Sequence, residues 1–373
     1  MSKSALVIGA GIVGLATARA LALRKYKVTV IERTQKAVGA SIRNFGMIWP
    51  VGQPDGELYE RAMLSRSIWK EVCNDAGIWY DEVGSLHMAY KKDEWQVLEE
   101  FKAITGDKRN CRLLSAEQTM QYSRAVVKEN LLGSLFSEEE MIVDPREAIE
   151  KIPALLSEKY GVRFIWGKAV TDICYPDVYA GKEEFTADEI YVCSGADFET
   201  LYPEIYTDTA ITKCKLQMLR LAAQPDSWRM GPALCGGLSL IHYKSFAAAP
   251  SLRLLKERLG NEYPDYIKWG IHVMVAQNQS GELTIGDSHE YGLTHDPFDR
   301  QFINQLILDY LKNFARFGNE NIIQTWNGIY PKLTNGETDL ILEPEKGVTI
   351  INGLGGAGMT LSFGLCEQLI GKK

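Results

Sequence analysis

Three glycines near the start of the chain have the spacing of a dinucleotide-binding turn. Gly9, Gly11 and Gly14 form a G-x-G-x-x-G pattern between an apolar run at residues 5–8 and an amphipathic stretch at residues 12–24. In such a turn the first glycine permits a sharp bend, the second lets the backbone approach a pyrophosphate, and the third lets the helix pack on the strand. The helix N-terminus that follows offers free N–H groups and a partial positive charge to the phosphates.

An acidic residue completes this unit. Glu32 ends a second apolar run at residues 28–31, where a carboxylate can accept hydrogen bonds from a ribose 2′-OH. The carboxylate disfavours a 2′-phosphate and therefore NADP, but it does not separate NAD from FAD. Glycines that serve only local packing are the alternative interpretation. Because strand, turn, helix, second strand and acid occur in this order, the stretch predicts a dinucleotide site.

A second glycine-rich junction lies near the other end of the chain. The stretch NGLGGAGMTLSFG follows an apolar run at residues 348–351 and leads into a helix expected to begin near Met359. Gly355, Gly356 and Gly358 would let the backbone come close to a bulky ligand, and the helix would direct another positive dipole end at it. Two such junctions suit a long dinucleotide held between them, which favours FAD over NAD.

The segment GASIRNFGMIWP has neither helix nor strand periodicity and is predicted to be a loop. In it, Ser41, Arg43 and Asn44 offer a hydroxyl, a guanidinium and an amide to a phosphate or a ring edge. A capped turn before the helix predicted at residues 57–76 is the alternative. Because the loop follows the dinucleotide motif, contact with the cofactor is favoured over a capped turn.

Composition places the chain among globular proteins with an ordinary balance of apolar and charged residues. It has 373 residues, of which 46% are hydrophobic and 24% charged, and a net charge of −7. The length predicts two lobes, and the acidic balance disfavours a nucleic-acid partner or a basic membrane patch. The longest apolar stretch, residues 5–16, is too short to span a bilayer. We therefore expect neither a membrane span nor export.

The seven cysteines are odd in number and scattered, and they form no C-x-x-C pair, while the five histidines are equally dispersed. This pattern predicts reduced thiols in a cytoplasmic protein. It argues against a disulfide framework and against a zinc site, so we predict no metal ligands.

The remaining helices and strands must position the glycine turns and the loop. The order of these elements predicts two domains whose segments alternate along the chain. Asp144 and Pro145 are typical of a helix start, and a strand at residues 189–193 runs into a second small-residue turn, Ser194-Gly195. Strands are also expected at 169–173 and 270–276, and a helix at 299–315. A strand followed by a glycine turn is where doubly wound sheets place ligands, so the first lobe resumes there. The predicted dinucleotide domain comprises residues 1–79, 141–214 and 328–373, and the substrate domain comprises 80–140 and 215–327.

Taken together, these segments resemble the FAD-dependent amine and amino-acid oxidases, which include glycine oxidase, sarcosine oxidase and D-amino acid oxidase. VIGAGIVGLATARAL with IER resembles their N-terminal FAD fingerprint, GASIRNFG their loop to the flavin, and TWNGIYPKLTNGETDLIL the segment before their C-terminal flavin contact. The resemblance implies an α/β fold with a Rossmann-like FAD-binding domain and a substrate domain whose mixed, largely antiparallel sheet is flanked by helices. The cofactor-binding residues implied are Gly9, Gly11, Ile12, Val13, Gly14, Glu32, Arg33, Ser41, Arg43, Asn44, Phe45, Gly46, Val170, Ser194, Gly195, Gly355, Gly356, Gly358, Met359 and Thr360.

The sequence departs from this family at two points. Glycine and D-amino acid oxidases commonly have an arginine that clamps the substrate carboxylate just before the proline of the last motif. Here Tyr330 precedes Pro331 and Lys332 follows it, so an ordinary α-amino acid is disfavoured. Sarcosine oxidase relatives attach flavin through a cysteine in this region, and residues 326–332 contain none. We therefore expect FAD to be bound noncovalently.

RNFGMIWP, GGLSLIHYKSF, GIHVM and TIGDSHEYG together resemble a subgroup associated with aminophosphonate breakdown. This resemblance implies a substrate like 2-aminoethylphosphonate or its N-methyl or hydroxy derivative. A phosphonate needs several cationic or hydrogen-bonding groups, and no catalytic acid or base is assigned. The candidate substrate-binding residues are Tyr330, Lys332, His242, Tyr243, His272 and Arg43.

The implied reaction is oxidation of a small primary or secondary amine to an imine. Hydrolysis of the imine gives an aldehyde and ammonia or an amine, while dioxygen, the expected electron acceptor, becomes hydrogen peroxide. A glycine, sarcosine or D-amino acid oxidase, an FAD-dependent dehydrogenase and a non-catalytic flavin-binding subunit are the alternatives. The oligomeric state stays open.

Overall fold

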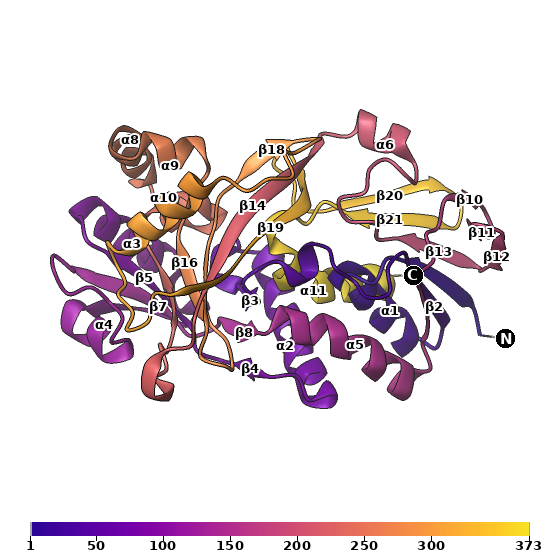
Figure 1. The fold of residues 1–373 in the computed structure, drawn as a ribbon, viewed down its shortest axis with the longest axis horizontal. Helices are drawn as coiled ribbons and strands as arrows, with labels where there is room; N and C mark the ends of the chain where they lie inside the picture. The colour runs from indigo at the N-terminus through magenta and orange to yellow at the C-terminus, as the bar shows by residue number, and fades with distance from the viewer. Residues whose placement is uncertain (1, 373) are drawn as a thin grey trace.

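A computed structural model describes residues 2–372 and contains two large sheets joined by a long pair of strands (Figure 1). The first sheet has the order β20-β21-β13-β1-β2-β9 and is parallel except for β20, which runs antiparallel to β21. Its strands are β1 (Ser4–Ile8), β2 (Lys27–Glu32), β9 (Arg163–Trp166), β13 (Glu189–Val192), β20 (Leu340–Glu345) and β21 (Val348–Asn352).

Strand β1 shows why this sheet is covered on both faces. Ala5 and Val7 belong to one hydrophobic core, and the alternate residues Leu6 and Ile8 belong to another. The first core lies against helices, and the second lies against a small antiparallel sheet. These covering elements are α1 (Ile12–Leu23), α2 (Glu57–Ala76), α5 (Pro145–Tyr160), α11 (Gly358–Gly371), β10 (Asp172–Cys174), β11 (Asp177–Ala180) and β12 (Glu183–Thr186).

The second sheet has nine strands in the order β18-β14-β17-β16-β15-β5-β7-β6, with β19 pairing β14. Only the β15–β5 pair among them is parallel, so the predicted mixed, largely antiparallel sheet is confirmed. Its strands are β5 (Ser85–Ala89), β6 (Cys111–Ser115), β7 (Gly133–Ser137), β14 (Ile211–Leu221), β15 (Ala233–Cys235), β16 (Met274–Gln277), β17 (Leu283–Gly286), β18 (Glu290–Gly292) and β19 (Ile322–Leu333).

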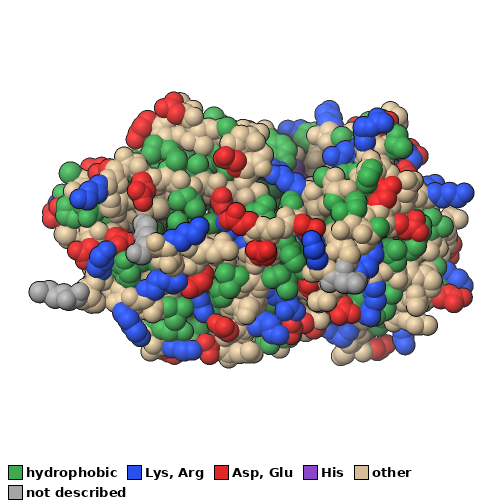
Figure 2. All heavy atoms as spheres, turned by 180° about the vertical axis from the view of Figure 1, so that it is seen from behind, with side chains coloured by type: hydrophobic (Ala, Val, Ile, Leu, Met, Phe, Trp, Pro, Cys, Tyr) green, Lys and Arg blue, Asp and Glu red, His purple; other side chains and the backbone are tan. Residues whose placement is uncertain are grey.

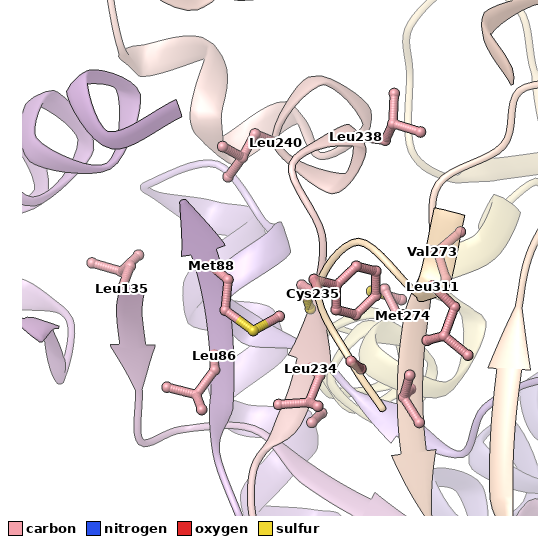
Figure 3. Packing of buried hydrophobic residues seen from close by; sticks show 14 of the residues in the cluster. Leu86, Met88, Leu135, Leu234, Cys235, Leu238, Leu240, Val273, Met274 and Leu311 are labelled. Carbon is pink, nitrogen blue, oxygen red and sulfur yellow. The ribbon is translucent and has the colours of Figure 1, made fainter. Parts of the chain in front are cut away.

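Helices cover this sheet and close a third core, in which side chains of β5, β15 and β16 lie side by side (Figure 3). Leu86, Leu234 and Val275 in this core have no exposed surface. The helices are α3 (Lys92–Thr105), α4 (Ala116–Tyr122), α7 (Leu238–His242), α8 (Leu252–Glu262), α9 (Pro264–Lys268) and α10 (Gln301–Leu311). The short elements that remain are α6 (Pro203–Asp208), β3 (Met47–Ile48), β4 (Tyr80–Asp81) and β8 (Met141–Val143), of which the three strands form a small sheet.

Most predicted elements are confirmed, and the differences have local causes. Asp144 accepts hydrogen bonds from the first N–H groups of α5, as its helix-start pattern predicts. The strands predicted at 169–173 and 270–276 are wrong at their starts, because β10 begins at Asp172 and β16 at Met274. A left-handed Gly270 (φ 55°) forms the bend before β16. Helix α10 is likewise shorter than the predicted 299–315.

The domain division remains a prediction, but the strand order bears on it. All six strands of the first sheet lie within the segments predicted for the dinucleotide domain. The predicted boundaries at residues 214 and 327 fall inside β14 and β19, which are paired along their lengths and run between the two halves (Figure 1). The two halves are therefore joined by continuous strands as well as by loops.

Acidic and basic side chains are interspersed over the face shown in Figure 2. Among residues 2–372, no helix combines the length and the apolar character that crossing a membrane requires.

A buried carboxylate connects the start of the second sheet to the loop that follows β3. Glu140 accepts hydrogen bonds from the Val51 N–H and the Ser85 Oγ, both at 2.9 Å. Burial raises the pKa of its carboxyl from 4.5 to about 6. Because the folded-state pKa exceeds the unfolded value, protonated Glu140 stabilises the fold, and this stability is lost as pH rises through 4.5 to 6.

We predict that Glu140→Gln removes this pH-dependent loss. A glutamine can still accept from the Val51 N–H and donate to the Ser85 hydroxyl. Because the pKa rises from 4.5 to about 6 on folding, the unfolding free energy of the variant minus that of the wild type should increase by about 2 kcal/mol between pH 4 and pH 7. Urea unfolding at both pH values measures the difference, and a pH-independent difference would contradict the prediction.

Candidate functional site

A cavity of about 780 Å³ lies where the two sheets meet. Its volume is within the range of cofactor and ligand sites in proteins. Residues from both ends of the chain and from both sheets line it. The predicted residues on this lining are Gly11, Ile12, Val13, Ser41, Arg43, Asn44, Phe45, Gly195, His242, Tyr243, His272, Tyr330, Lys332, Gly355, Gly356, Gly358, Met359 and Thr360.

The N-terminal glycines have the separate roles that their spacing predicts. Gly9 has a φ of 101°, which favours glycine. A Cβ on Gly14 would lie 1.9 Å from the Gly9 carbonyl oxygen, so only glycine allows α1 to pack this closely on the turn. Gly11 lines the cavity, and a Cβ there would meet only the Ser41 Oγ, at 3.1 Å. The Gly11 backbone is thus open to a ligand.

The C-terminal glycine turn lies beside the N-terminal one, as the sequence predicts. Gly355 adopts a φ of 59°, and a Cβ on Gly358, the first residue of α11, would lie 3.8 Å from the Ile12 Cγ2. Helices α1 and α11 therefore begin at the same cavity and pack along each other (Figure 1). The first N–H groups of a helix have no carbonyl partner within it, so two positive helix ends face this space.

The loop before β3 is held in place by the side chains predicted to contact the cofactor. The Ser41 Oγ accepts a hydrogen bond from the Ile12 N–H at 2.9 Å. The Asn44 amide donates to the carbonyls of Ala40 and Ser41, both at 3.0 Å, so it caps its own turn. The Arg43 guanidinium donates to the Asn327 carbonyl at 3.3 Å and borders the cavity.

Several residues predicted for the adenosine end lie outside the lining of this cavity. The Glu32 carboxylate accepts from the Ala10 N–H at 2.9 Å and from the Thr34 N–H and hydroxyl, which ties the glycine turn to the end of β2. Arg33 forms an ion pair with Asp197. The role of Glu32 toward a ribose stays a prediction. The predicted residues outside the lining are Gly9, Gly14, Glu32, Arg33, Gly46, Val170 and Ser194.

The strand β19 places two predicted substrate groups beside the C-terminal glycine turn. A Cβ on Gly356 would lie 3.5 Å from the Tyr330 hydroxyl, and one on Gly355 would lie 3.9 Å from the Lys332 Cγ. The Lys332 Nζ donates to the Tyr291 hydroxyl at 3.1 Å. Burial raises the pKa of Tyr330 well above its ordinary value, so its hydroxyl stays protonated.

Three of the five histidines meet on the cavity lining, although they are dispersed in the sequence. The ring of His242 stacks on that of His272, with centroids 3.6 Å apart, and lies 4.9 Å from that of His289. The donor nitrogens of the three lie within 4.8 Å of one another. Two backbone hydrogen bonds, of 3.2 and 2.8 Å, pair His272 with Asp287 and extend the β16–β17 ladder. Sequence spacing gave no signal for this cluster.

Burial and mutual charge set the ionisation of this cluster. Burial, followed by the neighbouring imidazoles, lowers the pKa of His242. Burial also lowers the pKa of His289, against the opposing effect of Asp287. Burial opposes ionisation of Asp287, but the charges of His289 and His272 keep its pKa below the ordinary value. Burial and the neighbouring imidazoles thus favour the neutral forms of His242 and His289, which lie beside one carboxylate.

The glycine turns, the two helix ends and the cavity fit a flavin dinucleotide. Backbone approaches the cavity at both turns without a side chain in between, and the helix N-termini suit a pyrophosphate. A parallel sheet carrying this turn, joined to a largely antiparallel sheet across the cavity, defines a two-part flavoprotein oxidoreductase.

The chain belongs to the DAO family, described as FAD dependent oxidoreductases, which it matches over residues 4–370. FAD is accordingly its cofactor. A D-amino acid dehydrogenase of Helicobacter pylori is 26% identical over 281 residues, covering 60% of this chain and 65% of that protein's length. The chain thus spans just under two thirds of this curated relative.

Solved structures share the fold at low sequence identity. Glycine oxidase from Geobacillus kaustophilus superposes with a TM-score of 0.78 and 18% identity, covering 100% of this chain and 96% of that one. The dithionite-reduced, FAD-bound L-alpha-glycerophosphate oxidase from Mycoplasma pneumoniae gives a TM-score of 0.74 and 18% identity, covering 100% and 95%. The predicted α/β flavoprotein fold is confirmed.

We predict that Gly11→Ala weakens FAD binding without unfolding the protein. The backbone at Gly11 (φ −71°) suits alanine, and the new methyl group would meet only the Ser41 Oγ within the protein, yet it would project toward the cavity. The dissociation constant for FAD, measured by fluorescence quenching, should rise at least about tenfold, or about 1.4 kcal/mol.

Gly260→Ala is the matched control, because nothing lies within 4 Å of the added Cβ, which is in α8. It should retain wild-type affinity for FAD. An unchanged affinity in Gly11→Ala would contradict the placement of the cofactor at this turn.

Proposed function

We propose that this protein is an FAD-dependent oxidase of a small amine that carries a strongly acidic group, an aminophosphonate such as 2-aminoethylphosphonate or its N-methyl or hydroxy derivative. The observation that carries the proposal is the set of polar groups gathered at one cavity. All six predicted substrate residues border it: Arg43, His242, Tyr243, His272, Tyr330 and Lys332.

The missing arginine clamp supports a substrate other than an ordinary α-amino acid. Tyr330 occupies the position before Pro331, so this wall offers a neutral hydroxyl and the Lys332 ammonium in place of a bidentate guanidinium. A tetrahedral phosphonate has three oxygens and needs several separate donors, whereas a guanidinium matches the plane of a carboxylate. Lys332 with the Tyr330 and Tyr291 hydroxyls supplies such separated donors.

The chain's own residues would bind and orient the substrate. Lys332 would attract the anionic group and, as a nearby cation, lower the pKa of the substrate amine so that it enters the reaction neutral. Apolar side chains on the lining, Phe45, Leu216 and Met218 among them, would exclude water from the reacting carbon. FAD, when bound, supplies the two-electron oxidation of the carbon–nitrogen bond.

We also propose that FAD is held noncovalently in a cytoplasmic enzyme that passes its electrons to dioxygen. Noncovalent binding is supported by β19, which carries no cysteine between residues 326 and 332. The cytoplasmic location is supported by the seven cysteines, all of which are free thiols.

A dehydrogenase is the second candidate, because the Helicobacter pylori relative is a D-amino acid dehydrogenase. The two differ in their electron acceptor. Peroxide formed in air in amounts equal to the amine consumed would favour an oxidase, and turnover only with an added dye acceptor would favour a dehydrogenase.

The substrate class is tested by mixing the purified holoenzyme anaerobically with single amines. We expect 2-aminoethylphosphonate or its N-methyl derivative to bleach the flavin absorbance faster than glycine, sarcosine or D-alanine. Faster bleaching by the amino acids would contradict the aminophosphonate proposal. Failure of every amine to bleach the flavin would favour the non-catalytic alternative.

We predict that Lys332→Ala and Tyr330→Phe reduce substrate affinity more than flavin retention. Loss of a donor to an anion should raise the KM of the best amine at least about tenfold. The flavin-to-protein absorbance ratio should stay within about a fifth of the wild-type value. Lys312→Ala, an exposed change at the end of α10, is the control and should alter neither quantity. Equal losses of flavin and affinity would contradict the assignment.

A further inference from the structure

We propose that His242, His272 and His289, together with Asp287, bind one divalent transition-metal ion on the cavity wall. The proposal rests on the geometry of these four side chains and not on the identity of the amine. It revises the expectation from the sequence that the chain has no metal ligands.

The contact between His272 and Asp287 is the first observation. The His272 Nε2 lies 3.0 Å from the Asp287 Oδ1, yet this oxygen has no hydrogen-bond donor. The His272 Nδ1 also lacks a partner, and the two residues are 3% and 5% exposed. Buried polar atoms are costly to leave unpaired. The His272 Nε2 and the Asp287 Oδ1 are therefore close enough together to bind one ion.

The orientation of His289 is the second observation. Its Nδ1 donates to the Gly270 carbonyl oxygen at 2.8 Å, which leaves the lone pair on Nε2. That Nε2 lies 3.9 Å from the Asp287 Oδ2. A ligating histidine almost always donates its other ring N–H to a carbonyl or a carboxylate, and this bond fixes both the tautomer and the ring.

The ligand set identifies the class of metal. Three imidazoles and one carboxylate suit Zn²⁺, Co²⁺ or Ni²⁺, whereas Mg²⁺ and Ca²⁺ prefer oxygen ligands only. With metal–nitrogen bonds of about 2.1 Å, tetrahedral ligand atoms stand about 3.4 Å apart. The donor nitrogens here span up to 4.8 Å, so binding must draw the rings together by rotating the side chains.

The charge balance and the position of the site indicate what the ion would do. Asp287 supplies one negative charge that offsets the nearby Lys332, and all four ligands border the cavity. A further coordination position would face the cavity and accept water or an anionic oxygen. If the proposed function holds, that oxygen belongs to the phosphonate. The metal site itself does not depend on the proposed function.

The test uses untagged holoenzyme treated with a chelator and then dialysed. Titration with Zn²⁺ should give about one tight site per chain, and Co²⁺ should produce the visible d–d absorption of a low-symmetry nitrogen site. His242→Gln and His289→Gln should each weaken Zn²⁺ binding at least about tenfold and reduce the Co²⁺ bands. His295→Gln is the matched control, since this histidine lies outside the cavity lining, and should bind like the wild type.

Flavin content and thermal midpoint establish that each variant is folded. His242 ends the short helix α7 and is only partly buried, so His242→Gln still provides the test if His289→Gln does not fold. Absence of Zn²⁺ and Co²⁺ binding by the wild type, or equal binding by the wild type and all folded variants, would overturn the proposal. Because metal content is measured without turnover, failure of the amine panel would leave this result independent.

Discussion

The meeting of two helix N-termini at one cavity is the constraint on which the rest of the structure depends. Helices α1 and α11 begin beside each other at this cavity, and a glycine lets each of them pack closely on a neighbouring segment. A Cβ on Gly14 would overlap the Gly9 carbonyl, and one on Gly364 would lie 2.3 Å from the Arg61 carbonyl of α2. These close approaches help to bring two positive helix ends to one place, which suits a cofactor with two phosphates.

The second sheet completes the site from the other side. Strands β14 and β19 cross from one half of the molecule to the other, so residues proposed to face a substrate share a ladder with residues in the core of the second sheet. Tyr330 and Lys332 lie at the end of β19 nearest the C-terminal glycine turn. Of the histidines, His242 ends α7, whereas His272 and His289 lie just before β16 and just after β17. Both regular elements and loops therefore line the cavity.

Local patterns predicted the parts of the fold that depend on neighbouring residues. The glycine turn at Gly9, Gly11 and Gly14 could be predicted because the interacting residues are close in sequence. The same holds for the helix cap at Asp144. The histidine cluster was not predictable, since nothing in the spacing of His242 and His289 shows that the ends of α7 and β17 meet. The sequence also did not reveal the hydrogen-bond partners of the Glu32 and Asn44 side chains. Their residue types suggested ligand contacts, but their hydrogen bonds go to the neighbouring backbone in the structure.

The pairing of the two glycine turns also bears on biosynthesis. The ribosome makes the turn at Gly9 long before the one at Gly355, and strand β13, which separates β1 from β21 in the first sheet, is made between them. The nascent chain therefore contains the first glycine turn well before the second one is made. Contacts of such long sequence separation form slowly. Flavin binding that uses both turns would accordingly follow the emergence of β21 and α11 from the exit tunnel.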